Sequence, residues 1–302
     1  MVENAATIIR EMKSHPPIFI GLGEILWDLL PSGKQLGGAP ANFAYHAHAL
    51  GAEARAVSRV GDDPLGREIL DRLRALGLTT DGIGMDTNAP TGTVSVELAA
   101  DGQPRFIIHE NVAWDRMVAD EASLAFAARA DAVCFGSLAQ RREPSRSSIR
   151  ALVAATPATA LRVFDINLRQ QFYSPEIVET SLQLANVLKL NDQELPVLAA
   201  MFGLRGGVRE QLAALAKQFG LRAVALTRGA HGSLLLAAGI WSDHPGLAVK
   251  VADTIGAGDA FTAALTLGLL AGRPLDDINR HANEVAAYVC SQPGATPPMP
   301  GQ

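Results

Sequence analysis

Short apolar runs recur along the chain and alternate with segments of helical periodicity. Each run holds about four to six apolar residues with little polar alternation, which is typical of strands covered on both faces. The predicted strands are "IFIGLG" (18–23), "ADAVCFGS" (130–137), "LRVFDIN" (161–167), "ANVLKLN" (185–191), "LRAVALTRG" (221–229) and "LAVKVADTIG" (247–256).

Helical patterns lie between these runs, as at 63–77 and 207–220. Both of these segments end in glycine, as helix C′ positions often do. Strands that alternate with helices predict an α/β fold, with a doubly wound, mainly parallel sheet and right-handed crossovers.

Two segments, 26–38 and 91–110, break this rhythm and do not have a helical pattern. The second is typical of a hairpin, with Asp101 and Gly102 as its turn. We therefore expect a single domain over 1–302 with a small β-sheet inserted from these two segments. Residues 1–15 are expected to be a loose leader.

Composition and charge narrow the function classes. The chain has 302 residues and a formal net charge of -5, which fits one large domain and disfavours a general nucleic-acid surface. No stretch approaches the roughly 20 apolar residues of a membrane span, and the acidic start is unlike a secretory signal. The two cysteines, Cys134 and Cys290, are expected to be buried thiols in a reducing cytoplasm.

Polar and glycine residues gather where the predicted strands end. In open α/β sheets, ligands bind at the carboxyl ends of the strands. These residues are Glu24, Asp165, Asn167, Asn191, Thr227, Gly229 and the segment 253–259. The pattern indicates a polar, phosphorylated ligand.

The segment "DTIGAGDAF" (253–261) places glycines and a carboxylate at the start of a predicted helix. The first N–H groups of a helix lack internal partners and carry the positive end of the dipole, so Gly256, Ala257 and Gly258 could hold a phosphoryl anion. Asp259 could then take a proton from an attacking hydroxyl. A plain turn, with Asp259 as a dipole-favoured acid, explains the same pattern.

A second helix is predicted over 40–50 within "GGAPANFAYHAHALG". Asn42 lies in its first turn and could bind sugar hydroxyls, or could use its amide locally. Glu24 and Asp28 could gather hydroxyls, or could be solvated loop acids.

Other strand ends offer weaker signals. Asn191 and Glu194 could help hold hydrated Mg²⁺, but Asn with Glu three residues later also resembles a capping box. Arg169 could reach a phosphate or lie on the surface. The segment 226–233 could wrap a nucleotide or form a glycine hairpin.

Several common motifs are absent from the sequence. It holds no G-x-x-x-x-G-K-[ST] loop, no complete G-x-G-x-x-G fingerprint, no H-E-x-x-H zinc helix and no G-x-S-x-G elbow. These absences disfavour a P-loop enzyme, a nicotinamide-dependent oxidoreductase, a zinc protease and an α/β-hydrolase.

Taken in order, "GGAPANFAYHAHALG" and "DTIGAGDAF" resemble the two signatures of ribokinase-like (PfkB) sugar kinases. "VGDDPLGREIL" (60–70), "NDQE" (191–194), "TRGAHGS" (227–233) and "HANEVAAYVCSQPGA" (281–295) match further landmarks of that family. The resemblance covers residues 17 to 298. It implies an α/β domain whose small sheet is a lid, cytoplasmic transfer of the ATP γ-phosphoryl group to a sugar, and a possible homodimer through the lid.

The resemblance also implies roles for particular residues. Asp259 would be the base, and Gly256, Ala257 and Gly258 the anion hole. The sugar would be held by Asp28, Gly38, Asn42 and Arg169. The nucleotide would be held by Asn191, Glu194, Thr227, Gly229 and Asn283, with Glu194 holding Mg²⁺ through water. Asp253, the Ile255 carbonyl and Gly294 would hold a monovalent cation, usually K⁺.

Within the family, "GEILWDLLP" (23–31), "DINLR" (165–169) and "HENVAWD" (109–115) most resemble fructokinases. The segment 136–141 lacks the carboxylate that ribokinases place there, which disfavours ribose. A 2-keto-3-deoxygluconate kinase is the alternative, with Arg105 or Arg169 facing the sugar acid. A binding regulator without catalysis is an alternative of another class.

Overall fold

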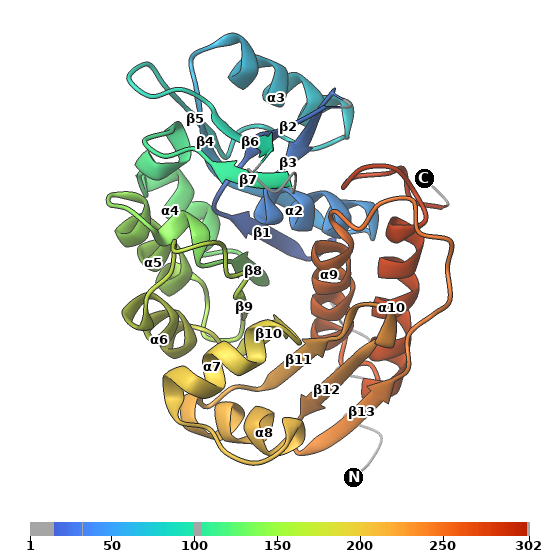
Figure 1. Cartoon of the computed structure of the whole chain (residues 1–302). Coiled ribbons are helices and arrows are strands. Elements are labelled where there is room, and N and C mark those ends of the chain that lie inside the picture. Colours follow the sequence, from blue (N-terminus) through green and yellow to red (C-terminus); the bar gives the residue numbers. More distant parts are fainter. Residues whose placement is uncertain (1–14, 32, 99–103, 301–302) are drawn as a thin grey trace.

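The computed structural model describes residues 15–31, 33–98 and 104–300 (Figure 1). A nine-stranded sheet forms the body of the fold, in the order β13-β12-β11-β10-β9-β8-β1-β4-β5. The strands from β5 through β11 pair in parallel, and only β12 and β13 pair antiparallel. The prediction of a doubly wound, mainly parallel sheet is therefore confirmed.

The strand bounds follow the apolar runs closely. The nine strands are β1 (Ile18–Leu22), β4 (Glu53–Gly61), β5 (Ile83–Asp86), β8 (Ala132–Phe135), β9 (Leu161–Asp165), β10 (Val187–Asn191), β11 (Ala223–Thr227), β12 (Ser233–Ala237) and β13 (Ile240–His244). The central residues of β1, β8, β9, β10 and β11 are buried because helices cover both faces of the sheet, whereas the edge strands β5 and β13 are partly exposed.

Helices form a layer on each face of the sheet (Figure 1). One layer holds α2 (Ala39–Ala49), α3 (Pro64–Ala75), α9 (Ala257–Leu270) and α10 (Leu275–Cys290). The other holds α4 (Glu121–Ala127), α5 (Ser145–Ala155), α6 (Pro175–Leu184), α7 (Glu194–Phe202) and α8 (Val208–Phe219). The predicted glycine stops are present, since Gly77 and Gly220 follow α3 and α8 with φ of 81° and 64°.

A separate four-stranded sheet has the order β3-β2-β6-β7. Its strands are β2 (Leu26–Leu30), β3 (Gly33–Gly37), β6 (Gly92–Leu98) and β7 (Pro104–Ile108). They come from the two segments in which no helix was expected. β6 and β7 pair antiparallel, as a hairpin requires, while the predicted turn at Asp101 and Gly102 lies outside the described residues. The predicted leader over 1–15 also lies outside them, except for His15.

One predicted strand is wrong. The segment 247–256 forms neither helix nor strand, and Leu247, Val249 and Val251 are exposed. Its alternating valines favour a strand, but among the described residues the segment joins no strand, and the sheet ends at β13. A turn follows instead, in which Asp253 Oδ1 accepts from Ile255 N at 3.0 Å.

The apolar runs do not predict β4, β5 or β13, and they predict that both cysteines are buried. Cys134 is buried on β8, whereas Cys290 is half-buried because it ends α10 beside the exposed segment 251–252. Neither forms a disulfide. No helix in the described part of the chain has the length and apolar character needed to span a membrane.

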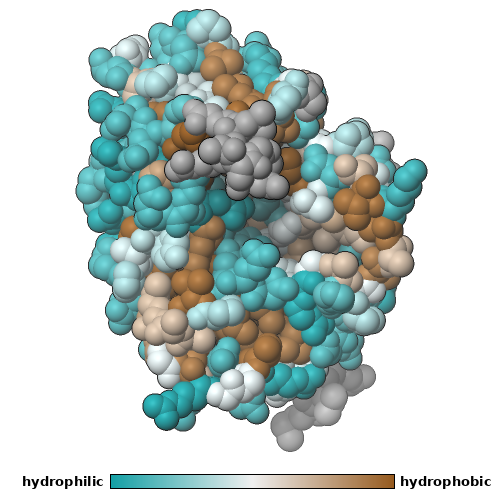
Figure 2. All heavy atoms as spheres, viewed as in Figure 1, coloured by the Kyte–Doolittle hydropathy of each residue, from teal (hydrophilic) through white to brown (hydrophobic). Residues whose placement is uncertain are grey.

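The face seen in Figure 2 is mostly hydrophilic, and its apolar residues occur in separate groups. The polar strand ends lie together at the carboxyl edge of the parallel strands, where Glu24 follows β1, Asp165 ends β9, Asn191 ends β10 and Thr227 ends β11. The small sheet lies on the same side of the molecule (Figure 1). This edge is where a ligand site is expected.

Candidate active site

The turn that leads into α9 has the geometry of an anion site. Gly256 adopts a left-handed φ of 79°, and a Cβ there would collide with the carbonyl oxygen of Ala295, so only glycine fits. In the described part of the chain, no hydrogen-bond partner is found for the backbone N–H of Gly258 or Asp259. Free N–H groups at the positive end of a 14-residue helix favour an anion.

Asp259 lies in the first turn of α9, beside these free N–H groups. Its Oδ2 accepts a hydrogen bond from Asn42 Nδ2 at 2.8 Å, which fixes the direction of the carboxylate. Burial raises the pKa of Asp259 to about 6, helped by the charge of Asp165 and opposed by Asn42 and two cations. A carboxylate with a raised pKa is a better proton acceptor while still ionised near neutral pH.

Asn42 is held by α2, whose first turn begins at Gly38 and Pro40. Gly38 has a φ of 110°, and a Cβ there would collide with the carbonyl oxygen of Glu24. Asn42 is buried, and its Oδ1 has no hydrogen-bond partner. A buried amide oxygen without a partner is costly, so this atom is available to a hydroxyl donor of a ligand.

Two further carboxylates, Glu24 and Asp28, approach the same space. Burial raises the pKa of Glu24 to about 7 and that of Asp28 to about 6, while the charge of Arg169 opposes both shifts. Glu24 Oε2 is buried without a partner. The structure thus brings Asp28, Asn42 and Asp259 together, and it adds Glu24, which the sequence suggested only weakly.

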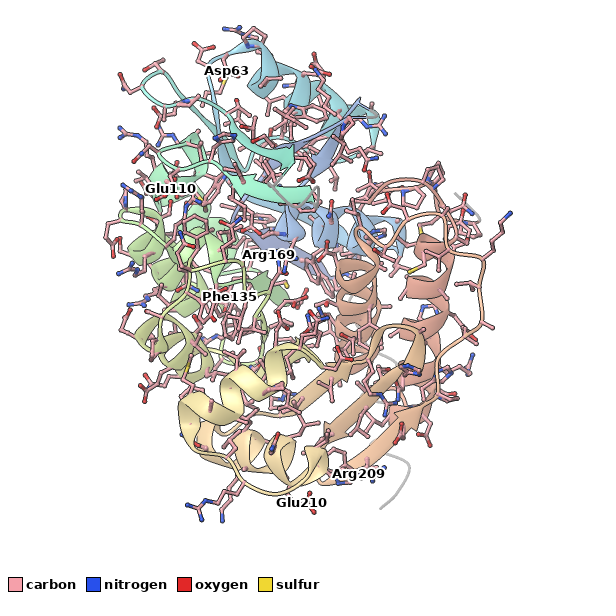
Figure 3. All side chains as sticks on the ribbon, in the orientation of Figure 1. Asp63, Glu110, Phe135, Arg169, Arg209 and Glu210 are labelled. Carbon is pink, nitrogen blue, oxygen red and sulfur yellow. The ribbon has the colours of Figure 1, made fainter. Side chains whose placement is uncertain are left out.

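Arg169 is the exposed cation that these acids share. It follows β9 in a loop where Asn167 and Gln170 adopt positive φ angles of 42° and 48°. Gln170 Nε2 donates to Phe106 O of the small sheet at 2.7 Å, so the loop bridges the two sheets. Figure 3 shows Arg169 near the middle of the molecule, beneath the small sheet.

Asn191 and Glu194 form the reciprocal pair of a capping box. Asn191 N donates to Glu194 Oε2 at 2.8 Å, and Glu194 N donates to Asn191 Oδ1 at 2.9 Å. Glu194 Oε1 also accepts from Leu168 N at 2.9 Å, which ties α7 to the Arg169 loop. Both carboxylate oxygens are therefore already engaged, and each keeps a further lone pair for water.

The predicted nucleotide residues lie around Ser233. Thr227 pairs with Ser233 across β11 and β12, and Asn283 Nδ2 donates to Ser233 Oγ at 2.7 Å. The segment 226–233 is an antiparallel pair closed by a short 3-10 turn at Gly229, which is the hairpin alternative. Asn283 is buried and uses its amide N–H groups within the protein.

The predicted monovalent-cation residues are also neighbours. Asp253 Oδ1 accepts from Ile255 N, and Asp253 Oδ2 accepts from Gly294 N at 3.2 Å. Among the described residues, no cluster of three or more histidine, cysteine, aspartate or glutamate side chains could ligate a metal ion.

Residues 293–298 form a strap across the site. Tyr45 and Tyr288 donate to the carbonyl oxygens of Pro297 and Pro298, each at 2.7 Å. His46 Nε2 contacts the Ala295 carbonyl oxygen at 2.9 Å, and burial lowers the pKa of His46 to about 4, so the neutral ring donates. The strap therefore ties α2, which carries Asn42, to the Gly256 turn.

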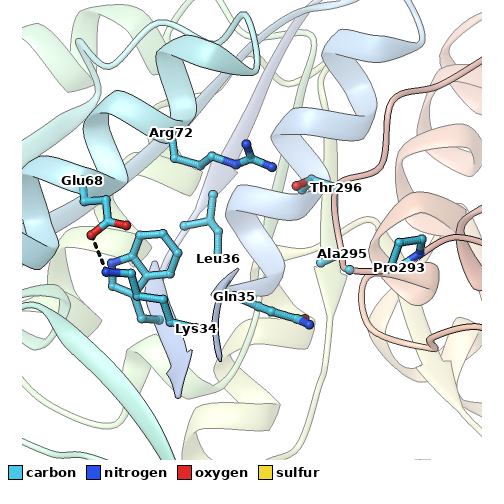
Figure 4. Close-up of a pocket in the computed structure, with 10 residues that line it drawn as sticks. Lys34, Gln35, Leu36, Glu68, Arg72, Pro293, Ala295 and Thr296 are labelled. Carbon is cyan, nitrogen blue, oxygen red and sulfur yellow. Dashed lines mark hydrogen bonds and ion pairs between the residues drawn. The ribbon is translucent and has the colours of Figure 1, made fainter. Parts of the chain in front are cut away.

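A pocket of about 310 Å³ lies between this strap, the small sheet and α3 (Figure 4). It is lined by Trp27, Lys34, Gln35, Leu36, Glu68, Arg72 and the segment 293–296. Lys34 and Glu68 form an ion pair at its rim. The pocket shares the strap residues 293–296 with the surroundings of the α9 turn.

Sequence reasoning missed Lys189 and His46. Lys189 lies on β10, is buried, and forms an ion pair with Asp165 at 3.0 Å. Its signal was present, because a lysine inside the buried run "VLKLN" needs a paired acid to be tolerated. His46 carried no comparable signal, because a histidine among alanines in a predicted helix does not by itself indicate a buried partner.

Known proteins resemble this chain over most of its length. A model of the pfkB family of carbohydrate kinases matches residues 32–302. An uncharacterized sugar kinase of Pyrococcus horikoshii is 31% identical over 293 residues, which is 91% of this chain and 90% of that protein. Fructokinase-1 of Zea mays is 29% identical over 316 residues, with 96% of each chain covered.

Solved structures show the same likeness. The crystal structure of the Pyrococcus horikoshii sugar kinase superposes with a TM-score of 0.80 at 30% identity, covering 92% of this chain and 93% of that one. The fructokinase of Vibrio cholerae O395, with fructose, ADP and calcium bound, superposes with a TM-score of 0.77 at 28% identity, covering 93% and 94%. This chain belongs to the pfkB family of carbohydrate kinases.

Proposed function

We propose that the protein transfers the γ-phosphoryl group of ATP to a hydroxyl of a sugar, and that fructose is this sugar. The observation that carries the proposal is Asp259, held by Asn42 beside the free N–H groups of the α9 turn. Phosphoryl transfer depends on positioning and charge neutralisation, and this arrangement offers both.

Each residue then has a part in the transfer. Asp259 accepts the proton of the attacking hydroxyl, and Gly256, Ala257 and Gly258 stabilise the charge on the transferring group. Asn42 Oδ1 and Asp28 accept from other sugar hydroxyls, and Gly38 lets the backbone approach the sugar. The small sheet acts as a lid that keeps water from the γ-phosphoryl group.

The nucleotide would lie along Asn191, Thr227, Gly229 and Asn283. Mg²⁺ prefers oxygen ligands and keeps several waters, and it would shield phosphate charge here. Glu194 fits a hold through water, because both its oxygens already accept backbone N–H groups. Asp253, Ile255 and Gly294 would hold K⁺.

Fructose is favoured by relatives, since a similar protein from Vibrio cholerae O395 has fructose and ADP bound. The alternative, 2-keto-3-deoxygluconate, is a sugar acid. The exposed guanidinium of Arg169 beside Asp28 and Asp259 supports it, because it could pair with a substrate carboxylate.

The small sheet also offers a contact for a homodimer. Phe106 on its edge strand β7 is 52% exposed, and Leu29 on β2 is 37% exposed. Sedimentation of the native chain and of Phe106→Ser tests this contact, since a dimer through the lid would be weakened by the serine.

The decisive assay measures ADP release with Mg²⁺-ATP across fructose, 2-keto-3-deoxygluconate, ribose, glucose and nucleosides. We expect fructose to give the highest kcat/KM, and Asp259→Asn to lower kcat by about 10²–10⁴-fold. Asp71→Asn is the control, because Asp71 pairs only with Arg74 on the surface of α3. A folded Asp259→Asn protein with unchanged turnover would contradict the role of the base.

A further inference from the structure

A buried positive charge lies directly beneath the anion turn. Lys189 projects from β10 toward α9, and a Cβ built on Gly258 would be 3.2 Å from its Nζ. Lys189 is 7% exposed, and lysine is almost never buried to this degree unless it is paired. The Lys189 ammonium group therefore takes up the space that a side chain at position 258 would need, so the turn keeps a glycine there.

The neighbours of Lys189 keep it charged. Burial opposes the charge, but Asp165, Glu194 and Asp259 outweigh burial and raise the pKa of Lys189 above its ordinary value. Asp165 is its cross-strand partner in the register of β9 and β10, and Asp165 Oδ1 accepts from Nζ at 3.0 Å. The ammonium group is therefore fixed by the sheet.

Thr262 connects this pair to the turn above it. Its hydroxyl lies 2.9 Å from Asp165 Oδ2 and 2.9 Å from the Gly258 carbonyl oxygen. Thr262 is one turn along α9 from Gly258, and it is fully buried. The strands β9 and β10 and the first turn of α9 thus share one polar network.

We propose that Lys189 and Asp165 are a positioning pair for phosphoryl transfer, which holds the anion turn in place and sets the charge that Asp259 experiences. The proposal rests on the function proposed above for its kinetic consequences. Lys189 adds a fixed positive charge behind the N–H groups of the turn. Asp165 holds the Lys189 ammonium group, so that Lys189 does not form an ion pair with Asp259 instead.

The two members of the pair act on Asp259 in opposite directions. Asp165 raises the pKa of Asp259, and Lys189 lowers it. Removing the charge of Lys189 should therefore raise the pKa of Asp259, and removing the charge of Asp165 should lower it. A purely structural pair would lose stability in both variants without such opposite shifts.

Other groups also face Asp259, and all stay unchanged in the test. They are Asn42 on α2, Glu24 before β2, Arg169 after β9 and the thiol of Cys134 on β8. Because these groups are common to every variant, differences between variants report the pair alone.

The test compares Lys189→Met, Lys189→Arg, Asp165→Asn and the double variant Lys189→Met/Asp165→Asn. For Lys189→Met we expect kcat to fall about 10- to 100-fold, with little change in KM for the sugar. The acid limb of kcat/KM should move up by about one pH unit in Lys189→Met and down in Asp165→Asn. Lys189→Arg should recover most of the turnover.

A second readout does not depend on sugar kinase activity. The carboxyl ¹³C signal of Asp259, assigned by its loss in Asp259→Asn, is titrated by NMR in each variant. Failure of the proposed function would leave the opposite shifts intact, whereas equal or absent shifts would overturn the positioning pair even in an active kinase.

Folding of the single variants does not decide the outcome. The double variant removes both charges with side chains of similar size, so it avoids an unpaired charge in the core. It should shift the titration of Asp259 less than either single variant and keep the loss of turnover seen for Lys189→Met. A double variant with native kcat overturns the proposal.

Discussion

Two buried ion pairs in this fold have opposite designs. Arg141 and Asp115 form a pair whose side chains are each 2% exposed, and Lys189 and Asp165 form one with side chains 9% and 6% exposed. Burial is similar, but the pairs differ in their neighbours. In the first, which we call the closed pair, the two charges interact mainly with each other; in the second, the open pair, Lys189 also interacts with other carboxylates. The difference separates an ion pair that holds the structure from one that serves the site.

The pair of Arg141 is held by two hydrogen bonds and two aromatic rings. Its Nε and Nη2 donate to the two oxygens of Asp115 at 2.7 and 2.8 Å, and the guanidinium stacks over Trp114 and Phe172. A planar fork of this kind fixes both partners in direction as well as distance. The pair therefore ties the segment 109–115 to the segment that follows β8, and Arg141 Nη2 also donates to His109 O at 2.7 Å.

The pair of Lys189 has one short contact and several longer ones. An ammonium group is a point charge without a preferred plane, so it acts on every carboxylate around it. Lys189 influences Glu194 and Asp259 as well as Asp165. Arginine suits a pair that fixes the structure, whereas lysine suits a site in which one positive charge interacts with several carboxylates.

The largest effect on stability should follow from breaking the closed pair. Arg141→Met leaves Asp115 buried and uncompensated, so we expect a loss of about 3–5 kcal/mol in the free energy of unfolding. Urea denaturation measures it. Arg142→Met is the matched control, because Arg142 pairs with Glu110 on the surface, where such a pair contributes about 0–1 kcal/mol. An equal loss of unfolding free energy in Arg141→Met and Arg142→Met would show that the buried Arg141–Asp115 pair contributes no more than the surface pair.

A smaller effect should come from Glu24, an acid with no fixed cation. Its pKa rises from 4.5 to about 7 on folding, so its stability contribution is present below pH 4.5 and is lost as pH rises to about 7. Glu24→Gln should therefore be more stable than the native chain at pH 8, by up to about 3 kcal/mol, with the gain vanishing near pH 5.

Thermal unfolding across this pH range measures the change. Glu121→Gln is the control, since the same substitution there replaces a carboxylate that is exposed at the start of α4. A Glu24→Gln gain that did not depend on pH would mean that packing, not ionisation, was altered.

The smallest effect should come from Thr262→Val, which keeps the shape of the side chain and removes its hydroxyl. We expect a cost of about 0.5–1.5 kcal/mol in stability and a loss of up to about tenfold in kcat. Thr266→Val is the control, because Thr266 lies one turn further on α9 and donates only to Thr262 O. Similar kcat values in both variants would show that Thr262 does not couple the Lys189–Asp165 pair to the α9 turn.

The sequence was most informative where buried strands meet capped helices. The strands that carry Asp165, Asn191 and Thr227, and the helices that carry Asn42 and Asp259, lie close to their predicted bounds. Apolar runs and the glycines that end helices are local signals, so they can be recognised without knowledge of the fold.

The rest depended on contacts that are distant in sequence. β4 contains Glu53, Arg55 and Arg59, which interrupt its apolar run, and the exposed valines of 247–256 alternate like those of a strand although the segment joins none. The hold of the strap on Gly256 and the place of Lys189 under Gly258 likewise arise only from tertiary packing. Local pattern cannot report which distant backbone approaches a glycine.

The contact between α2 and α9 has a consequence for how the molecule assembles over time. The Asn42–Asp259 bond joins residues 217 positions apart, and the His46–Ala295 bond joins residues 249 apart. Bringing such distant segments together is slow, because loop-closure entropy opposes it until neighbouring strands have paired. We therefore expect the sheet to form before the active site, so that activity is the last property gained in folding and the first lost when this contact opens.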